Sequence, residues 1–310
     1  MALSAPPSVL LLAFAPAVMW GFTPVIEKRA LSGGGTPLQA SLTVVVVDSS
    51  VYLLALALLD PTPFADLTLE TAAIFAAAGV FGTALGRLAI FAGNARVGAS
   101  ISSAVVSARP LFATALAVGF LGEPLSGPTA VGIVVLVVGL GVLSVSKGGD
   151  LAGWSGPDLL VPLAAAALFA VGNVTRRWGL STADATPLEA VAINEVAALV
   201  VLVGYVAITG PERVLNRPRR SYLIFAASGL ITAVALLSMF TALAAPEGRV
   251  AVVDPLVAMA PLFTVVFSWY WLGDIERVSR GVVAGATLVV LGAALVTAGP
   301  TLLSVVVGLP

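Results

Sequence analysis

Long apolar stretches alternate with short polar segments along the whole chain, and this pattern predicts a bundle of membrane-spanning helices. The stretches are continuous rather than alternating in polarity, which argues against transmembrane strands. The first stretch has no Lys or Arg before it, so it is interpreted as a membrane helix rather than a signal peptide. Ten spans are predicted, at residues 9–30, 38–59, 70–93, 97–121, 128–146, 158–178, 188–209, 221–244, 250–272 and 281–303.

Short motifs recur in the same order at an offset of 150–151 residues, and two glycines recur nearby at an offset of 153, which indicates a duplication. The matched pairs are TPLQA at 36–40 with TPLEA at 186–190, PLF at 110–112 with 261–263, LGE at 121–123 with LGD at 272–274, and Gly132 and Gly139 with Gly285 and Gly292. The predicted halves, residues 1–150 and 151–310, each hold five helices, so the second half enters the membrane from the opposite side. The expected fold is an all-α integral membrane protein with two inverted five-helix repeats, an architecture typical of secondary transporters.

Composition excludes several classes of protein. Of the 310 residues 59% are hydrophobic and only 10% are charged, and the mean hydropathy is +1.08. A soluble protein carries roughly 25% charged residues, so soluble enzymes, nucleic-acid binders and disordered scaffolds are ruled out. The chain has no His and no Cys, which removes the usual zinc ligands and thiol chemistry. It also lacks a GxxxxGK[ST] loop, so neither a cofactor, a metal nor direct use of ATP is expected.

Several motifs carry a resemblance to a known family. They are Trp20-Gly21-Phe22 followed by Lys28, the stretch from Val97-Gly98-Ala99-Ser100 to Ala108-Arg109-Pro110-Leu111-Phe112, and Phe120-Leu121-Gly122-Glu123-Pro124-Leu125. Together they resemble the drug/metabolite transporter superfamily, and most closely its ten-helix EamA-like members. Two positions depart from that pattern, namely Arg109 before the proline and Gly273-Asp274 in the second half. The resemblance implies export of amino acids or related polar metabolites by alternating access.

Ionisable side chains inside predicted spans are candidates for function, because each costs about 2.5–3.5 kcal/mol at the centre of a membrane helix. Those well inside the spans are Asp48, Arg87, Arg109, Glu195 and Asp254. A second group is expected to lie at helix ends and to extend towards the lipid headgroups: Glu27, Lys28, Arg29, Arg176 and Arg177. Helical spacing places Trp20, Thr23 and Glu27 on one face, and Thr83, Arg87 and Asn94 on another.

These residues predict a central cavity lined by the first, third, fourth, sixth, eighth and ninth helices. Arg109, next to the helix-bending Pro110, is expected to be its main cation, with Asp254 as the acid facing the same space. The two differ by roughly 10 Å in depth, so an amphoteric metabolite is expected to bridge them. Further polar contacts are expected from Arg87, Asn94, Asn173, Ser102 and Thr23. The alternative is that Arg109 pairs with Asp48 or Glu195 and is structural.

Proton coupling would require a carboxylate that titrates during transport, and the candidates are Asp254, Glu195, Glu27 and Asp48. A membrane enzyme acting on lipid-like substrates is an alternative, as is a non-transporting membrane subunit. No acidic cluster of the kind needed for metal and phosphate chemistry supports the enzyme, and the inverted halves argue against the subunit. The expected partners are a small-molecule substrate and the lipid bilayer, with no nucleic acid, and the chain is expected to be a monomer or homodimer in the cell membrane.

The orientation of the chain stays open at this stage. The resemblance implies cytoplasmic termini, which would leave only Arg176, Arg177 and Arg249 in cytoplasmic segments. The opposite side would then carry Lys28, Arg29, Arg96, Lys147, Arg213, Arg217, Arg219, Arg220, Arg277 and Arg280. The positive-inside rule favours the reverse orientation, so the two arguments disagree.

Overall fold

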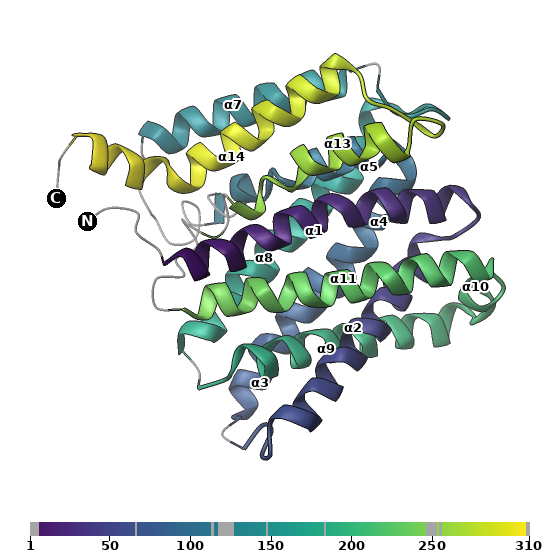
Figure 1. The fold of residues 1–310 in the computed structure, drawn as a ribbon, viewed down its shortest axis with the longest axis vertical. Coiled ribbons are helices and arrows are strands. Elements are labelled where there is room, and N and C mark those ends of the chain that lie inside the picture. Colours follow the sequence, from purple (N-terminus) through teal and green to yellow (C-terminus); the bar gives the residue numbers. More distant parts are fainter. Residues whose placement is uncertain are drawn as a thin grey trace.

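The computed structural model describes residues 6–65, 67–112, 115–116, 127–146, 148–182, 184–245, 253 and 256–307. The described chain is a helix bundle with one antiparallel two-stranded ribbon at one end, β1 (Gly149–Asp150) paired with β2 (Glu276–Arg277) (Figure 1). The helices are α1 (Pro7–Ser32), α2 (Pro37–Leu59), α3 (Leu69–Ala78), η1 (Gly79–Leu85), α4 (Gly86–Val97), α5 (Ala99–Val106), α7 (Gly127–Ser144), η2 (Gly156–Leu159), α8 (Leu160–Thr182), α9 (Pro187–Thr209), α10 (Glu212–Leu215), α11 (Arg219–Ala244), α13 (Ala260–Trp271) and α14 (Arg280–Val307).

The helices account for the predicted spans. Among the described residues, six helices or helical runs are long and apolar enough to cross a membrane: α1, α2, the run Leu69–Val97 formed by α3, η1 and α4, the run Gly156–Thr182 formed by η2 and α8, α9 and α11. Helices α7 and α14 are further apolar helices, and α5 and α13 belong to the fourth and ninth spans. The chain is therefore an all-α, ten-helix membrane protein. The start of α1 and the end of α14 lie on the same side of the bundle, as an even number of crossings requires (Figure 1).

Helix packing follows a two-fold pattern that exchanges the two halves. The first helix, α1, packs on the eighth, α11, and the sixth helix, α8, packs in the same way on the third, α3–η1–α4. Likewise α2 packs on α11, and its counterpart α9 packs on α3 and η1. The pairs α2–α9, α5–α13 and α7–α14 each join equivalent helices of the two halves. The halves are thus interleaved, as expected for an inverted repeat of five helices.

The fourth and ninth spans are interrupted at equivalent positions. The helical pattern breaks into turns at residues 107–108 and 258–259, two residues before Pro110 and Pro261 respectively. A proline has no backbone N–H to donate and its ring crowds the preceding turn, which explains both breaks. The breaks lie against each other, because the Ser107 hydroxyl donates to the Ala258 carbonyl at 3.4 Å. The expected bend beside Arg109 is confirmed, whereas Asp254-Pro255 lies outside the described residues.

Recurring glycines mark the contact between α7 and α14. A Cβ added to Gly132 would lie 2.6 Å from the backbone nitrogen of Val296, and one added to Gly292 would lie 2.5 Å from that of Leu136. Such distances are shorter than real Cβ contacts, so only glycine lets the two backbones approach this closely. The repeated glycines therefore serve one interface, in which a glycine of each helix faces the backbone of the other.

A second duplicated motif starts α2 and α9. Thr36 and Thr186 are the N-caps of these helices, and each side chain accepts a hydrogen bond from the amide three residues later. Proline follows at the first helical position in both, where its missing N–H is not needed. The repeated Thr-Pro pair is thus a helix start rather than a binding motif.

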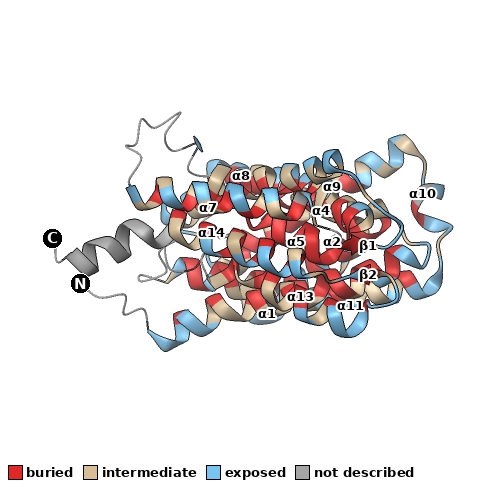
Figure 2. Cartoon of the chain, turned by 90° about the horizontal axis from the view of Figure 1, so that it is seen from above, coloured by how far each residue is buried: buried red, intermediate tan, exposed pale blue. Residues whose placement is uncertain are grey.

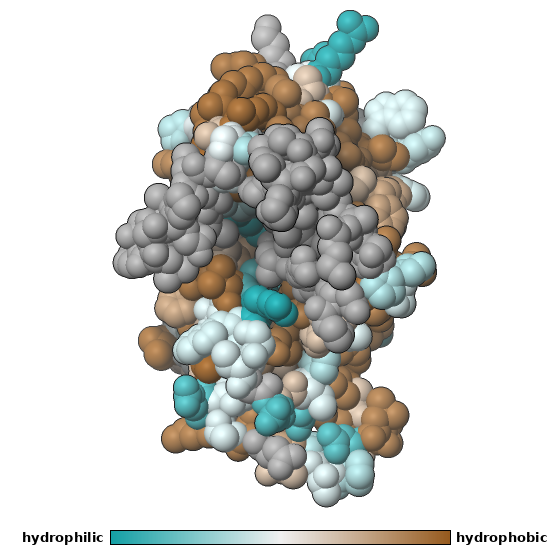
Figure 3. Space-filling model, turned by 90° about the vertical axis from the view of Figure 1, so that its left-hand side faces the viewer, coloured by the Kyte–Doolittle hydropathy of each residue, from teal (hydrophilic) through white to brown (hydrophobic). Residues whose placement is uncertain are grey.

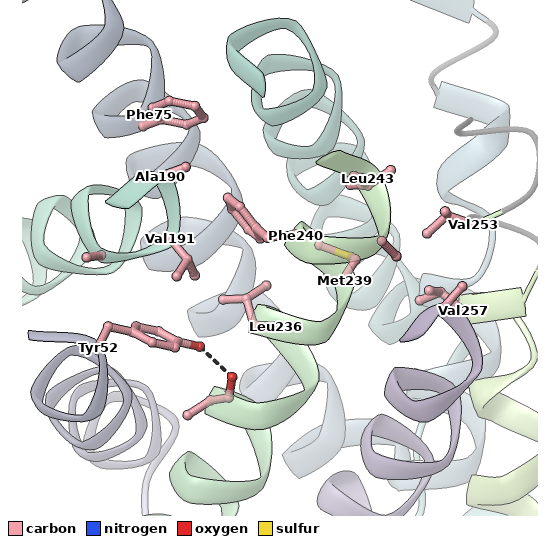
Figure 4. Close-up of a cluster of buried hydrophobic side chains, with 14 of the residues drawn as sticks. Tyr52, Phe75, Ala190, Val191, Leu236, Met239, Phe240, Leu243, Val253 and Val257 are labelled. Carbon is pink, nitrogen blue, oxygen red and sulfur yellow. Dashed lines mark hydrogen bonds between the residues drawn. The ribbon is translucent and has the colours of Figure 1, made fainter. Parts of the chain in front are cut away.

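Apolar side chains fill the bundle and also cover its outside. One buried cluster gathers Tyr52, Phe75, Leu236, Met239, Phe240 and Leu243 from α2, α3 and α11, and the Tyr52 hydroxyl donates to the Ala233 carbonyl at 2.8 Å (Figure 4). Buried residues form the middle of the bundle, and exposed ones lie mainly on its outer faces and in the loops (Figure 2). Large apolar side chains such as Leu58 and Val200 are 74% and 66% exposed, and hydrophobic residues cover much of the described surface in Figure 3. An apolar exterior of this kind fits lipid rather than water.

Candidate functional site

A cavity of about 140 Å³ lies between the two halves. Its walls come from α1, η1, α4, α8 and α11, from both interrupted spans, and from Val44 of α2. Its polar lining residues are Thr23, Glu27, Thr83, Arg87, Ser103, Ser107, Arg109, Asn173, Arg176 and Thr232, and its apolar ones include Trp20, Phe91, Phe169, Leu236, Met239 and Val257. The six helices expected to line a cavity all do so.

The structure brings most of the expected site residues together. Thr23, Arg87, Arg109 and Asn173 line the cavity. Asn94 is buried behind the wall, where its amide donates to the Glu27 carboxylate at 3.3 Å. Asp254 lies outside the described residues.

Ser102 does not line the cavity, contrary to expectation. Its side chain is buried but is not among the cavity-lining residues, and a Cβ added to Gly93 would lie 2.7 Å from the Ser102 hydroxyl. The turn at residues 107–108 interrupts the helix between Ser102 and Arg109, so the two side chains do not share one continuous face. Ser103 and Ser107 take the expected place in the cavity wall.

Arg87 is the centre of a buried ion-pair network next to the cavity. Its Nη1 lies 2.8 Å from Asp48 Oδ2 and 3.3 Å from Glu195 Oε2, and both carboxylates are fully buried. The Thr83 hydroxyl donates to Glu195 Oε1 at 2.9 Å. Asp48 is thus paired with a cation in the bundle, and Arg87 occupies the pairing position that one alternative gave to Arg109.

The network continues to Arg176 on α8. Asn194 donates to the Thr83 hydroxyl and to Glu195, while Arg176 donates to Asn194, Asn173 and Thr83. We call this set the central network, and its members are Asp48, Thr83, Arg87, Asn173, Arg176, Asn194 and Glu195. It joins helices of both halves.

Tight backbone packing positions the central network. Thr83 lies in η1, a π-helical segment, and such segments are frequent at functional sites. A Cβ on Gly79 would lie 2.0 Å from the Asn194 carbonyl oxygen, and one on Gly172 would lie 2.6 Å from the Gly82 Cα. These glycines allow η1 to approach α9 and α8 closely enough for Thr83 to reach Asn194.

The expectation that Glu27, Lys28 and Arg176 extend towards the headgroups is wrong. Their exposed fractions are 6%, 2% and 4%, and Glu27 and Arg176 line the cavity. The reason is that α1 and α8 continue to Ser32 and Thr182, so these residues lie about one turn or more before the helix end and face neighbouring helices. Arg29 is exposed, as expected, and Arg177 is half-buried and donates to the Leu243 carbonyl. Glu27 accepts hydrogen bonds from Asn94 and Ser228.

A second buried cluster lies at the end of the bundle that carries β1 and β2. Lys28 donates to the Ala95 carbonyl at 3.1 Å and forms an ion pair with Asp150. Glu276 accepts hydrogen bonds from the first amides of α5, those of Ala99 and Ser100, at 2.9 and 2.8 Å, and also from the Ser100 hydroxyl. A carboxylate at a helix N-terminus satisfies otherwise unpaired amides. We call Lys28, Asp150, Ser100 and Glu276 the end cluster.

Burial raises the pKa of Glu276 above its usual value, although the hydrogen bonds from Ser100 and Ala99 and the charge of Lys28 favour the ionised form. At the same end, the exposed Asp274 is paired with Arg29, whose hydrogen bond lowers the pKa of the Asp274 carboxyl. The described residues contain no group of three or more metal-ligating side chains.

Sequence reasoning missed the roles of Arg176, Asn194 and Glu276. Asn173, an expected contact on α8, lies one turn before Arg177 in the sequence, whereas its hydrogen-bond partner in the structure is the neighbouring Arg176. Asn194 and Glu276 had no signal, because their partners are distant in sequence.

Fold and cavity together define a multi-pass membrane transporter: inverted halves, interrupted helices that meet at the centre, and a charged cavity between them. The sequence model of the EamA-like transporter family matches residues 7–145 and 157–298, one match in each half. The chain belongs to this family, whose members are transporters rather than enzymes. A search of curated proteins found no match.

A crystal structure described only as that of a protein shares the fold. It is 16% identical in sequence, has a TM-score of 0.64, and the match covers 96% of this chain and 99% of the other.

Proposed function

We propose that this chain is a secondary-active exporter of a small polar metabolite such as an amino acid, and that it works by alternating access in the cell membrane. The observation that carries the proposal is the cavity itself, which lies between the interleaved halves and offers guanidinium groups, a carboxylate and apolar surface together. A zwitterion with an apolar side chain matches such a lining. We propose the boundary between the two repeats at residues 150–151, between the two matched regions, and the export direction follows the family resemblance.

Arg109 is proposed as a cationic contact for the substrate. It lines the cavity immediately after the interruption at residues 107–108, so a rearrangement of this interruption would move it. Arg87, Asn173 and Thr23 are proposed as further contacts. Asp254 remains a proposed contact from the ninth span.

Glu27 is the strongest described candidate for proton coupling. It lines the cavity and is held by the neutral groups of Asn94 and Ser228. Asp48 and Glu195 are paired with Arg87, so a proton on either would disrupt an ion pair. We therefore propose that Glu27 takes up a proton from one side of the membrane and releases it to the other side during the transport cycle.

The test is counterflow in proteoliposomes containing the purified chain, screened with amino acids, nucleosides and sugars. We expect uptake of at least one amino acid above empty liposomes. Arg109→Gln is expected to abolish this uptake while leaving the protein monodisperse, and Arg96→Gln, which removes a mainly exposed arginine near Asp158, serves as the control. Glu27→Gln is expected to keep exchange but lose uptake driven by a pH gradient. Normal transport by Arg109→Gln would refute its role, and no flux of any metabolite would refute the proposed function.

A further inference from the structure

Arg176 is a buried cation that contacts only neutral groups among the described residues. Its Nε donates to Asn194 Oδ1 at 3.0 Å, Nη1 to Asn173 Oδ1 at 2.9 Å and Nη2 to Thr83 Oγ1 at 3.0 Å. The guanidinium carbon lies 5.7 Å from the centre of the Phe240 ring. None of the ion pairs between described residues includes Arg176.

Arg87 differs from Arg176 in its counterions. Both arginines line the same cavity, but Arg87 contacts two carboxylates directly. The nearest carboxylate to which Arg176 is connected is that of Glu195, and the connection passes through Thr83 and Asn194. A buried charge without a direct counterion is costly, so such a group is retained where it serves a purpose.

The guanidinium also has hydrogen-bonding capacity left. An arginine side chain has five N–H groups, and the three hydrogen bonds use one from each nitrogen. One N–H on each terminal nitrogen remains, and two such donors suit the two oxygens of a carboxylate. Asn173, Asn194 and Thr83 fix the orientation of the guanidinium before any ligand arrives.

We infer that Arg176 is the carboxylate-recognising residue of the transport site. This inference rests on the proposed function and names its substrate class: metabolites with a carboxylate next to a small or apolar body, as in an amino acid. Thr83, Asn173 and Asn194 act as positioning residues. Phe169, Leu236 and Met239 supply apolar surface beside the bound anion.

The experiment compares ligands that carry a carboxylate with a ligand in which an amide replaces it, in protein that thermal unfolding shows to be folded. Leucine, leucinamide and isocaproate compete for the counterflow of radiolabelled leucine in proteoliposomes containing the full chain. We expect leucine and isocaproate to compete at least about tenfold better than leucinamide in the wild type, because a hydrogen-bonded charge pair contributes about 1.5–3 kcal/mol. The same ligands are tested for thermal stabilisation of purified protein, which requires no transport.

Arg176→Gln is expected to raise the half-inhibitory concentration of isocaproate about 10- to 100-fold and to leave that of leucinamide unchanged. Arg176→Lys keeps the charge without the planar fork and is expected to fall between these two. Arg177→Gln is the matched control, because it changes the adjacent arginine, which donates to the Leu243 carbonyl and not into the cavity. Thermal unfolding shows which variants are folded, and Asn173→Ala, which removes one acceptor of Arg176, is expected to weaken isocaproate binding even if Arg176→Gln fails to fold.

Equal competition by leucine and leucinamide in the wild type would overturn the inference, and so would an unchanged preference in Arg176→Gln. A protein that transports only sugars or nucleosides would also overturn it and would leave transport itself standing. Absence of flux for every metabolite class would instead refute the proposed function.

Discussion

The central network and the end cluster both join the two halves through buried charges, but they differ in what surrounds those charges. In the central network every group lies on a spanning helix, and Asp48 and Glu195 are fully buried. In the end cluster the acids belong to β1 and β2, and the Asp150 side chain retains 10% exposure. The free-energy cost of replacing a partner by water is therefore smaller in the end cluster than in the central network. We therefore expect the ion pairs of Arg87 with Asp48 and Glu195 to contribute more to the stability of the fold than the end cluster does, and the end cluster to separate more easily.

This difference bears on alternating access. Lys28 follows Glu27 directly, so the Lys28–Asp150 pair lies between the cavity wall and the end of α1. Glu276 fixes the start of α5, whose far end is interrupted beside the cavity. Separation of Glu276 from α5 would free the helix that carries Ser103 and leads to Arg109. We therefore expect the end cluster to close the cavity at the β1–β2 end, and two of the predictions below test this.

The largest expected effect is that of Arg87→Met. The variant leaves Asp48 and Glu195 facing each other without a cation, and removal of one partner of a buried ion pair costs about 3–5 kcal/mol. We expect a large loss of the free energy of unfolding, measured by thermal denaturation of the purified protein in detergent. The triple variant Arg87→Met, Asp48→Asn, Glu195→Gln removes the charges together and should recover part of this loss. An Arg87→Met protein as stable as wild type would show that the central network is not structural.

Lys28→Met is expected to have a smaller effect on stability and a larger one on access. Asp150 loses its partner but is close enough to the surface to be hydrated, so the cost is about 1–2 kcal/mol. Because the chain has no cysteine, a single Thr23→Cys substitution reports access to the cavity wall. We expect a membrane-impermeant thiol reagent to label this cysteine faster in the Lys28→Met background. Leu151→Ser, at an exposed neighbour of Asp150, is the control, and equal labelling in all three backgrounds would contradict a closing role for Lys28.

Much of this fold was predictable from sequence because hydropathy and repeats report on it directly. The ten spans, the inverted duplication and the bend at Pro110 follow from the length of apolar runs, from matched motifs and from the chemistry of proline. The cavity position of Thr23 followed from its spacing to Trp20. In each case the evidence lies within a single helix or in the similarity between equivalent segments of the two halves.

The central network and the end cluster were not predictable in the same way. Hydropathy places a residue along a helix but does not say where that helix ends or what it faces, so Lys28 and Arg176 were assigned to headgroups. The partners of these residues are distant in sequence, such as Asp150 for Lys28. Ser102 lies in the same span as Arg109, but its side chain faces Gly93 of α4 rather than the cavity, and this neighbour could not be read from spacing within one helix.

The smallest expected effect concerns the pH dependence of the end cluster. Burial raises the pKa of Glu276 above its ordinary value of 4.5, so the closed end binds a proton more readily than an open end in which Glu276 is hydrated. This proton stabilises the closed end at low pH, and the stabilisation is lost as the pH rises through the raised pKa. We therefore expect the labelling rate of Thr23→Cys to increase as the pH rises through the window above 4.5. Thiol reactivity itself depends on pH, so the rate is divided by that of the same reporter in Glu276→Gln, where this titration is absent. A ratio that stays constant with pH would show that Glu276 does not control the opening, which would leave the Lys28–Asp150 ion pair as the contact of the end cluster that could control it.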